Sequence, residues 1–277
     1  MSAVINTNVN SMNVQRALAS NQSDLQKTMH RLSTGLRING AADDAAGLAI
    51  TSRMTSQARG MDVAYRNAND AISLAETADS TLGQVANYLQ RMRDLAVQAA
   101  NVTNTSGDRD QLQNEFKSLS DEVSRILTNT TFNGLYILGS NAGSQAYQVG
   151  ANSGETVTVT TSNMVTGGVY DVVSASTISG TDGTNASTAL TAIDKALSNL
   201  STERSVYGAA QSRFEGIVSL LQISRDNQLA ASGRITDADY ASEMAKLTRA
   251  QILQQASTSM LSQANSQPNY ILTLLRG

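Results

Sequence analysis

The sequence has no cysteine, no tryptophan, one proline and one histidine among its 277 residues. Without cysteine the chain forms no disulfide, has no thiolate nucleophile and binds no metal through sulfur. The single histidine, His30, excludes a two-histidine metal site, a Ser-His-Asp triad and a histidine acid–base pair, and we expect it to be solvated or interfacial. We therefore expect no catalytic residue, no cofactor and no metal, and an enzyme is the least favoured class.

Aromatic residues make up only 4% of the chain, so a wide globular core would have to be filled by smaller apolar side chains. This favours narrow seams between helices. The net charge of −3 and the absence of any block of Lys or Arg give little reason to expect nucleic acid or an anionic membrane as a partner. No segment approaches the ~18 apolar residues of a membrane span, and the first residues lack the basic and apolar regions of a cleavable signal.

A heptad stripe predicts one long helix over residues 44–99, roughly 80 Å long at about 1.5 Å per residue. Its members are Met54, Met61, Ala68, Ala75, Leu82, Leu89 and Ala96. Turn formers follow, and Asp108 and Asp110 suit the start of a second, shorter helix. That helix carries an apolar stripe at Leu112, Phe116, Leu119, Val123 and Leu127.

Residues 132–188 are rich in Gly, Ser, Thr, Asn and Val and predict two or three β-hairpins, with strands in "GLYILG", "ETVTVTT" and "GGVYDVV". A disordered Ser/Thr linker is the alternative, and the Ser/Thr side chains are also candidates for O-linked sugars. Helical periodicity resumes near Leu190, and the second long helix returns antiparallel to the first. The predicted fold is mainly α, a long antiparallel helical hairpin or coiled-coil bundle with a small β-hairpin region at its tip.

Both ends of the chain carry thinner apolar stripes on polar helices. The N-terminal stripe contains Leu18, Leu25 and Leu32. The C-terminal stripe follows a capping box that starts at Thr236, and contains Tyr240, Met244, Leu247, Leu253, Ala256 and Met260. Helix breakers at two matching positions divide the chain into a discontinuous terminal coiled coil, residues 1–43 and 236–277, and a bundle domain, residues 44–235. Two thin seams bury little, so we expect the terminal pair to be marginal alone.

The chain ends in "QPNYILTLLRG", with Ile271, Leu272, Leu274 and Leu275 where chains normally fray into water. A terminal pair that cannot bury these side chains internally needs a partner. Two other candidate sites are weak. Asp43 and Asp44 are adjacent and cannot share one helix face, which favours capping or an inter-subunit role over a metal site. The glycine-containing turns lack the context of a dinucleotide-binding loop.

Several motifs, in order and at both ends, resemble those of bacterial flagellin. They are "INTNV.SM" at 5–12, "RLSTGLRIN.A.DDAAGLAI" at 31–50, "LQRMRDLAVQ" at 89–98, "DADYASEMAKLTRAQILQQA" at 237–256 and "QAN..P..IL.LLR" at 263–276. The resemblance covers nearly the whole chain but with a short β region, as in a flagellin that has only the inner terminal domain and the adjacent helical domain.

The resemblance implies a structural subunit that self-assembles into the helical flagellar filament for swimming motility. It implies type III export, a secreted and extracellular location, and four partner types: other copies of the chain, an export chaperone, the cap and the hook-junction proteins. In the family the terminal helices are disordered in the free monomer and fold in the filament. The implied polymerisation core is Leu18, Leu25, Leu32, Leu253, Met260, Ile271, Leu272, Leu274, Leu275 and Arg276.

The segment from Gln90 to Gln98 reads from sequence alone as an ordinary helix with an inward stripe and solvated arginines. The resemblance implies contacts with axial neighbours and with a host Toll-like receptor through Gln90, Arg91, Leu95, Gln98 and Glu115. It also implies that Leu272, Leu274, Leu275 and Arg276 are recognised by a cytosolic innate sensor. Two alternatives remain at this point: a hook-filament junction protein of the same architecture, and a cytosolic coiled-coil binding module.

Overall fold

In a computed structural model of the chain, the backbone is described for residues 7–276 and the side chains for residues 7–267. The chain forms two compact units. The terminal unit comprises Met1–Ser56 and Asn227–Gly277, and the bundle unit comprises Gln57–Asp226. The division falls within two long helices, so the predicted domain boundaries at the connectors, 43/44 and 235/236, stay predictions.

The described part of the chain is mainly helical, which confirms the predicted fold class. The helices are α1 (Val9–Thr34), α2 (Ala45–Ala99), α3 (Ser106–Asn129), α4 (Val169–Ser174), α5 (Thr184–Thr236) and α6 (Tyr240–Arg276). The strands are β1 (Thr131–Phe132), β2 (Leu135–Tyr136), β3 (Ser144–Gln148) and β4 (Thr156–Thr160). Polar side chains start several helices: Asp44 Oδ1 accepts a hydrogen bond from the N–H of Gly47 in α2, and Thr105 with Asp108 forms a capping box on α3.

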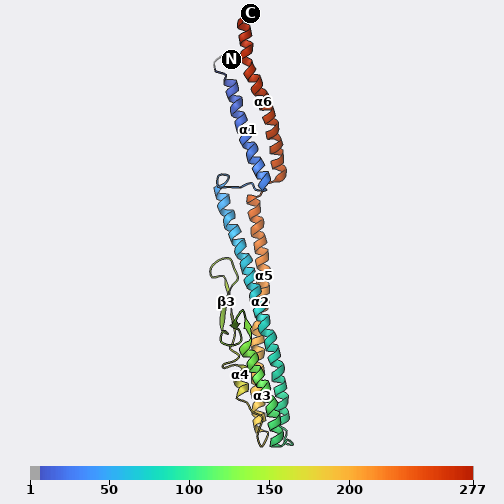
Figure 1. Cartoon of the computed structure of the whole chain (residues 1–277). Coiled ribbons are helices and arrows are strands. Elements are labelled where there is room, and N and C mark those ends of the chain that lie inside the picture. The colour runs from blue at the N-terminus through green and yellow to red at the C-terminus, as the bar shows by residue number, and fades with distance from the viewer. Residues whose placement is uncertain (1–6, 277) are drawn as a thin grey trace. The chain divides into compact units, whose positions relative to one another are not determined.

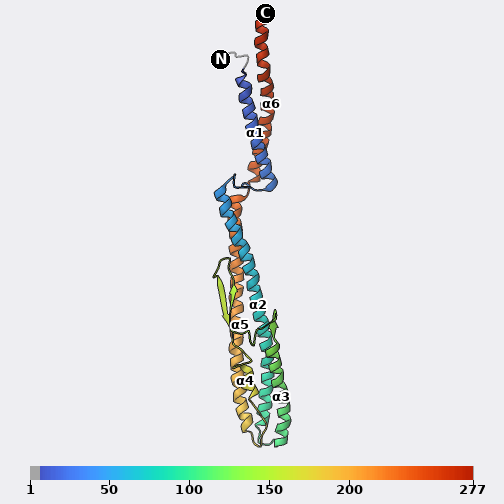
Figure 2. The ribbon, with the colours of Figure 1, turned by 60° about the vertical axis from the view of Figure 1, so that its left-hand side comes forward.

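In the terminal unit, α1 and α6 lie side by side in both views (Figures 1 and 2). Gly35 ends α1 in the left-handed conformation, with φ of 72°, which glycine adopts without steric cost. The connector after α1 then meets the connector before α6 through backbone hydrogen bonds. Arg37 N–H donates to the Thr236 carbonyl at 2.6 Å, and Ala238 N–H donates to the Gly35 carbonyl at 2.9 Å. The two predicted breaks in the sequence therefore lie opposite each other.

In the bundle unit, α2, α3 and α5 run side by side (Figures 1 and 2) and enclose one elongated core. The predicted α2 stripe is confirmed there: Leu82, Leu89 and Ala96 are fully buried. Phe116, Val123 and Leu127 of α3 are buried against it, as are Ile193, Leu200 and Tyr207 of α5. The heptad spacing placed these side chains on one face of each helix, and burying that face supplies most of the driving force for the bundle.

Two antiparallel hairpins, β1–β2 and β3–β4, form the only strand pairs among the described residues. The β3–β4 hairpin covers a second small cluster, in which Val157 packs with Ala68 of α2 and Phe214 of α5. Tyr147 meets Phe214 edge to face, with ring centroids 5.4 Å apart. This hairpin therefore packs along the sides of α2 and α5. The sequence predicts the β region at the end of the bundle, where Gly183 before α5 lies close to Ala100 after α2. The β3–β4 hairpin does not lie there.

The strand predicted in "GGVYDVV" is wrong, because Val169–Ser174 is the helix α4. Val169 and Val173 are both fully buried in the main core, and their i, i+4 spacing suits a helix. Asp171 accepts a hydrogen bond from the N–H of Gly167, which holds the turn before the helix. Burial of two valines on one side thus outweighs their preference for strands.

The break predicted in "ASGRITDAD" is confined to the last three residues of that stretch, Asp237–Asp239. Helix α5 continues through Gly233 and ends at Thr236. The capping box predicted from Thr236 is also wrong, because the hydroxyl of Thr236 donates back to the Ser232 carbonyl at 3.0 Å. Asp239 starts α6 instead, and its Oδ1 accepts from the N–H groups of Ala241 and Ser242.

Candidate functional site

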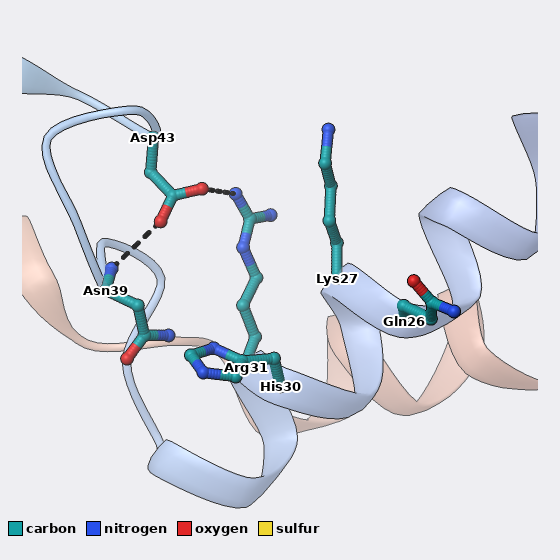
Figure 3. Close-up of a pocket in the computed structure, with 6 residues that line it drawn as sticks. All are labelled: Gln26, Lys27, His30, Arg31, Asn39 and Asp43. Atoms are coloured by element: carbon teal, nitrogen blue, oxygen red, sulfur yellow. Dashed lines mark hydrogen bonds and ion pairs between the residues drawn. The ribbon is translucent and has the colours of Figure 1, made fainter.

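The described part of the chain offers no group of three or more His, Asp or Glu side chains that could hold a metal ion. A hollow of about 260 Å³ lies in the terminal unit between α1 and the connector that follows it. Figure 3 shows Arg31 reaching toward Asp43, with Lys27 and His30 beside it; the guanidinium and the carboxylate are 4.0 Å apart. The N–H of Asn39 donates to Asp43 and holds the pKa of that carboxyl below its usual value. These contacts of Asp43 hold the connector between α1 and α2 against α1.

The contact between α1 and α6, which we call the inner seam, mixes polar, small and half-buried apolar side chains. Its buried side chains, among those described in the two helices, are Ser11, Thr28, Glu243, Ala250 and Ala264. No large apolar side chain is fully buried there. The seam therefore gains less from the hydrophobic effect than a seam of fully buried leucines would, because that effect scales with apolar area removed from water.

Hydrogen bonds fix the register of the inner seam. The Ser11 hydroxyl donates to Asn265 Oδ1 at 2.7 Å, the Asn21 amide donates to the Ala250 carbonyl at 3.0 Å, and the Asn8 amide donates to the Ala264 carbonyl at 2.7 Å. Each such bond contributes only about 0.5–1.5 kcal/mol net, because water offers the same groups alternative partners. These bonds specify how the helices align more than they stabilise the pair.

The large apolar side chains of the terminal pair fall into two sets. One set is half-buried at helical spacing from the buried seam positions: Val14, Leu18, Leu25, Leu32, Leu247 and Leu261. The other set points away from the inner seam. Those exposed on α1 and α6, which we call the outer apolar set, are Val9, Met12, Met29, Tyr240, Met244, Ile252, Leu253 and Met260. The C-terminal stripe predicted to face α1 is therefore wrong apart from Leu247, which is half-buried. The reason is register: α6 buries the positions of Glu243 and Ala250, and the apolar stripe is offset from them.

The predicted polymerisation residues thus fall into three groups. Leu18, Leu25 and Leu32 are half-buried on α1. Leu253 and Met260 are 48% and 65% exposed. The side chains of Ile271, Leu272, Leu274, Leu275 and Arg276 lie outside the described residues.

The predicted axial and receptor surface lies where α2 and α3 run together in the bundle unit. Gln90, Arg91, Gln98 and Glu115 are exposed, and the Arg91 guanidinium lies 2.7 Å from a carboxylate oxygen of Glu115. Leu95 is different: it is 1% exposed and packs in the main core. Its burial makes Leu95 a core residue of the single chain, and its role as a contact stays a prediction.

Three buried charged residues were missed. Arg109 is 2% exposed and donates to the carbonyls of Ala99, Asn101 and Thr181 at 2.8, 3.1 and 3.2 Å. Glu203 accepts from the Ser162 N–H at 2.7 Å. Glu243 accepts from Lys246, while its Oε2 is buried without a hydrogen-bond partner. The signal was spacing, because Arg109 is seven residues before Phe116 and Glu203 is three after Leu200 on the buried faces.

Long packed helices and an apolar surface on the terminal helices are typical of a helical structural protein. Comparison with known proteins gives the family. Residues 5–146 match the bacterial flagellin N-terminal helical region, and residues 190–275 match the C-terminal helical region. The chain belongs to the bacterial flagellin family, and it is a structural subunit of the flagellar filament rather than an enzyme.

Relatives match along the full length. The chain is 45% identical to the flagellin of Halalkalibacterium halodurans, with 99% of this chain and 100% of the relative covered. It is 37% identical to the flagellin of Bacillus subtilis, with 98% and 99% covered. A solved structure described as a flagellar hook-associated protein from Vibrio parahaemolyticus superposes with a TM-score of 0.60 over 70% of this chain and 100% of that one. At 17% identity it shows the fold alone, and the hook-junction alternative is not favoured.

No helix in the described range is both long and apolar enough to cross a bilayer.

Proposed function

We propose that the filament subunit polymerises by burying the outer apolar set of α1 and α6 against neighbouring copies of the chain. The observation that carries this proposal is that eight large apolar side chains of the terminal pair stay exposed, while the inner seam buries only small or polar side chains and covers its leucines in part. In water the exposed apolar area is unfavourable, and a homopolymer that stacks these helices removes it. Leu253, Met260 and the apolar residues 271–275 then belong to one polymerisation core, supported by the half-buried Leu18, Leu25 and Leu32.

A double variant, Leu253→Ser with Met260→Ser, tests this proposal. Full burial of each side chain contributes about 1.5–3 kcal/mol. Since about half of each side chain is already covered, we expect a loss of about 2 kcal/mol, or roughly a 30-fold rise in the critical concentration for seeded polymerisation. Val102→Ser is the control, because Val102 is 90% exposed on a turn of the bundle unit. Equal critical concentrations for the double variant and the control would remove these residues from the interface.

The second part of the proposal concerns the exposed face of α2 and α3. Gln90, Arg91, Gln98 and Glu115 form a polar surface that contacts the axial neighbour in the filament and, in the free subunit, a host Toll-like receptor. Support comes from their shared exposure and from the Arg91–Glu115 ion pair, which holds both side chains in place. Surface ion pairs contribute little to stability, so this arrangement costs the fold little when a partner replaces it.

The receptor contact is tested with the double variant Arg91→Ala and Gln98→Ala in a cell reporter assay. We expect at least a tenfold loss of potency. The matched control is Arg93→Ala, since Arg93 is also an ion-paired arginine of α2 but faces Asp194 of α5. If the control loses as much potency as the double variant, the effect does not arise from the proposed surface.

The same proposal includes four further kinds of partner: an export chaperone, the cap, the hook-junction proteins and a cytosolic innate sensor. Apolar ends that are exposed before assembly need cover during export, which an export chaperone would supply, and the cap and hook-junction proteins would present the same kind of helical surface. A cytosolic innate sensor would recognise residues 272–276 in the free chain. The extracellular location is part of this proposal. A pull-down of each partner with the full chain and with a chain lacking residues 263–277 tests it, and equal binding by both would contradict it.

A further inference from the structure

Methionine is unevenly distributed over the molecule. Of the nine methionines, Met1 lies outside the described residues. The four exposed ones all lie on the terminal helices: Met12 is 52% exposed, Met29 49%, Met244 39% and Met260 65%. The others lie in α2 or the bundle unit: Met54 and Met61 are half-buried, and Met92 and Met164 are at most 3% exposed. Two of the three exposed large apolar side chains of α1 are methionines.

A thioether is the one apolar side chain here that an ordinary oxidant converts into a polar one. Hydrogen peroxide transfers one oxygen atom to the sulfur: the O–O bond breaks, an S–O bond forms, the sulfur loses two electrons, and the remaining oxygen leaves as water. The product, methionine sulfoxide, is polar and disrupts apolar contacts, and methionine sulfoxide reductases reverse the reaction.

We propose that Met12, Met29, Met244 and Met260 are oxidation sites that control whether the free subunit can assemble. The proposal rests on the proposed function, because it requires that these side chains become buried between copies of the chain. Peroxide reaches them in the free subunit, and the resulting sulfoxides carry a polar oxygen into a surface that has to exclude water. Burying that oxygen without a hydrogen-bond partner is unfavourable.

The positions of the methionines also mean that oxidation affects assembly and not the fold of the subunit. Met92 and Met164 sit in the bundle core, so a peroxide dose that modifies the terminal methionines leaves the bundle intact. The inner seam is held by hydrogen bonds such as Ser11 to Asn265, which involve no sulfur. Oxidation therefore blocks assembly without unfolding the subunit. Once a subunit is in the filament, the four thioethers are covered and are oxidised more slowly.

Two complementary full-length variants test the proposal, both made with the volume-conserving change from Met to Leu. The terminal variant carries Met12→Leu, Met29→Leu, Met244→Leu and Met260→Leu. The bundle variant carries Met54→Leu, Met61→Leu, Met92→Leu and Met164→Leu. Each protein and the wild type are treated with hydrogen peroxide, quenched with catalase, mapped by peptide mass spectrometry and polymerised on untreated seeds.

After oxidation we expect the critical concentration to rise at least tenfold, or about 1.4 kcal/mol, for the wild type and the bundle variant. We expect less than a twofold change for the terminal variant, and recovery of the wild type after treatment with methionine sulfoxide reductases of both stereospecificities. The thermal unfolding of the bundle should not change.

Wild-type protein that carries all four sulfoxides and still polymerises at its original concentration would overturn the inference. So would a terminal variant that oxidation inactivates as strongly as the wild type, since the sensitive sulfur would then lie elsewhere. Failure of the untreated wild type to polymerise on seeds is a different result, and it would refute the proposed function itself.

Discussion

Substitution of Arg109 should lower the free energy of unfolding of the bundle unit substantially. It is 2% exposed, and its guanidinium donates to three backbone carbonyls: Ala99 at the end of α2, Asn101 in the turn that follows, and Thr181 just before α5. One side chain thus connects the end of α2, the start of α3 and the start of α5. The perturbation is Arg109→Met, which keeps an unbranched apolar stem of similar reach and removes every donor.

The expected cost follows from the three carbonyls that lose their donor. Ala99 is fully buried, and a buried acceptor left without a partner costs about 1–3 kcal/mol. Asn101 and Thr181 are exposed residues, so water can replace the guanidinium there at smaller cost. Removing a buried charge also returns part of its desolvation penalty. We therefore expect a net loss of about 3 kcal/mol, which lowers the Tm of a unit of this size by about 6–12 °C.

Urea unfolding of the full chain, followed by circular dichroism, measures this loss. The control is Arg125→Met, which removes an arginine with a 61% exposed side chain that pairs with Glu122 on the same helix and should change stability by less than about 0.5 kcal/mol. Arg109→Lys should lie between the two, because a single ammonium cannot satisfy three separated carbonyls as the planar guanidinium does. If Arg109→Met unfolds at the same urea concentration as the control, the three hydrogen bonds of Arg109 do not stabilise the bundle as argued.

Three further predictions follow from the described contacts. The hydrogen bond from the Thr105 N–H, and then the one from its hydroxyl, lower the pKa of Asp108, so this cap stabilises α3 fully above the unfolded carboxyl pKa of about 3.9 and loses its effect as the pH falls through the lower folded pKa. Asp108→Asn should therefore make the unfolding midpoint depend less on pH in the acid range, and an unchanged dependence would contradict this. Tyr147→Ala removes the ring contact with Phe214 and should cost about 2–3 kcal/mol in urea unfolding, against less than about 1 kcal/mol for the exposed Tyr136→Ala, with equal losses counting against the hairpin's packing role. Deletion of residues 263–277 should abolish polymerisation yet keep cooperative melting of the bundle, and a truncated chain that no longer melts cooperatively would show that the stable core was misplaced.

The sequence was most informative where large apolar side chains repeat on one helix face. The stripe through Leu82, Leu89 and Ala96 predicted α2 within a residue of its observed start and end, because a 55-residue helix without proline has no competing structure and only one apolar face. Spacing alone did not reveal which polar residues share that face. Arg109 and Glu203 occupy core positions, but a charged side chain is normally solvated, and only the carbonyl and N–H partners seen in the structure explain their burial.

The candidate site was predicted less well, for a related reason. Apolar periodicity identified Leu253 and Met260, but it assigned them to the contact with α1, since apolar faces of helices normally pair. Here the seam instead combines small and polar positions with half-buried leucines at other positions, and the position of Glu243 is buried. Ser11 and Asn265 meet through a hydrogen bond between side chains far apart in sequence, a contact that no local pattern contains. The burial of Leu95 was not anticipated, because the resemblance supplies positions along a helix but not the face that each one occupies.

The arrangement of the terminal pair has a physical consequence for a polymer subunit. If α1 and α6 buried Met29, Leu253 and Met260 between them, the pair would be stable alone and would have little left to gain from a neighbour. The observed inner seam does the opposite. Its hydrogen bonds set the alignment of the helices and its leucines are only half-buried, while each exposed outer side chain still offers about 1–1.5 kcal/mol for further burial, roughly half its full value. Because that gain appears only when another copy is present, the same residues that keep the free pair marginal make its association with a growing filament favourable.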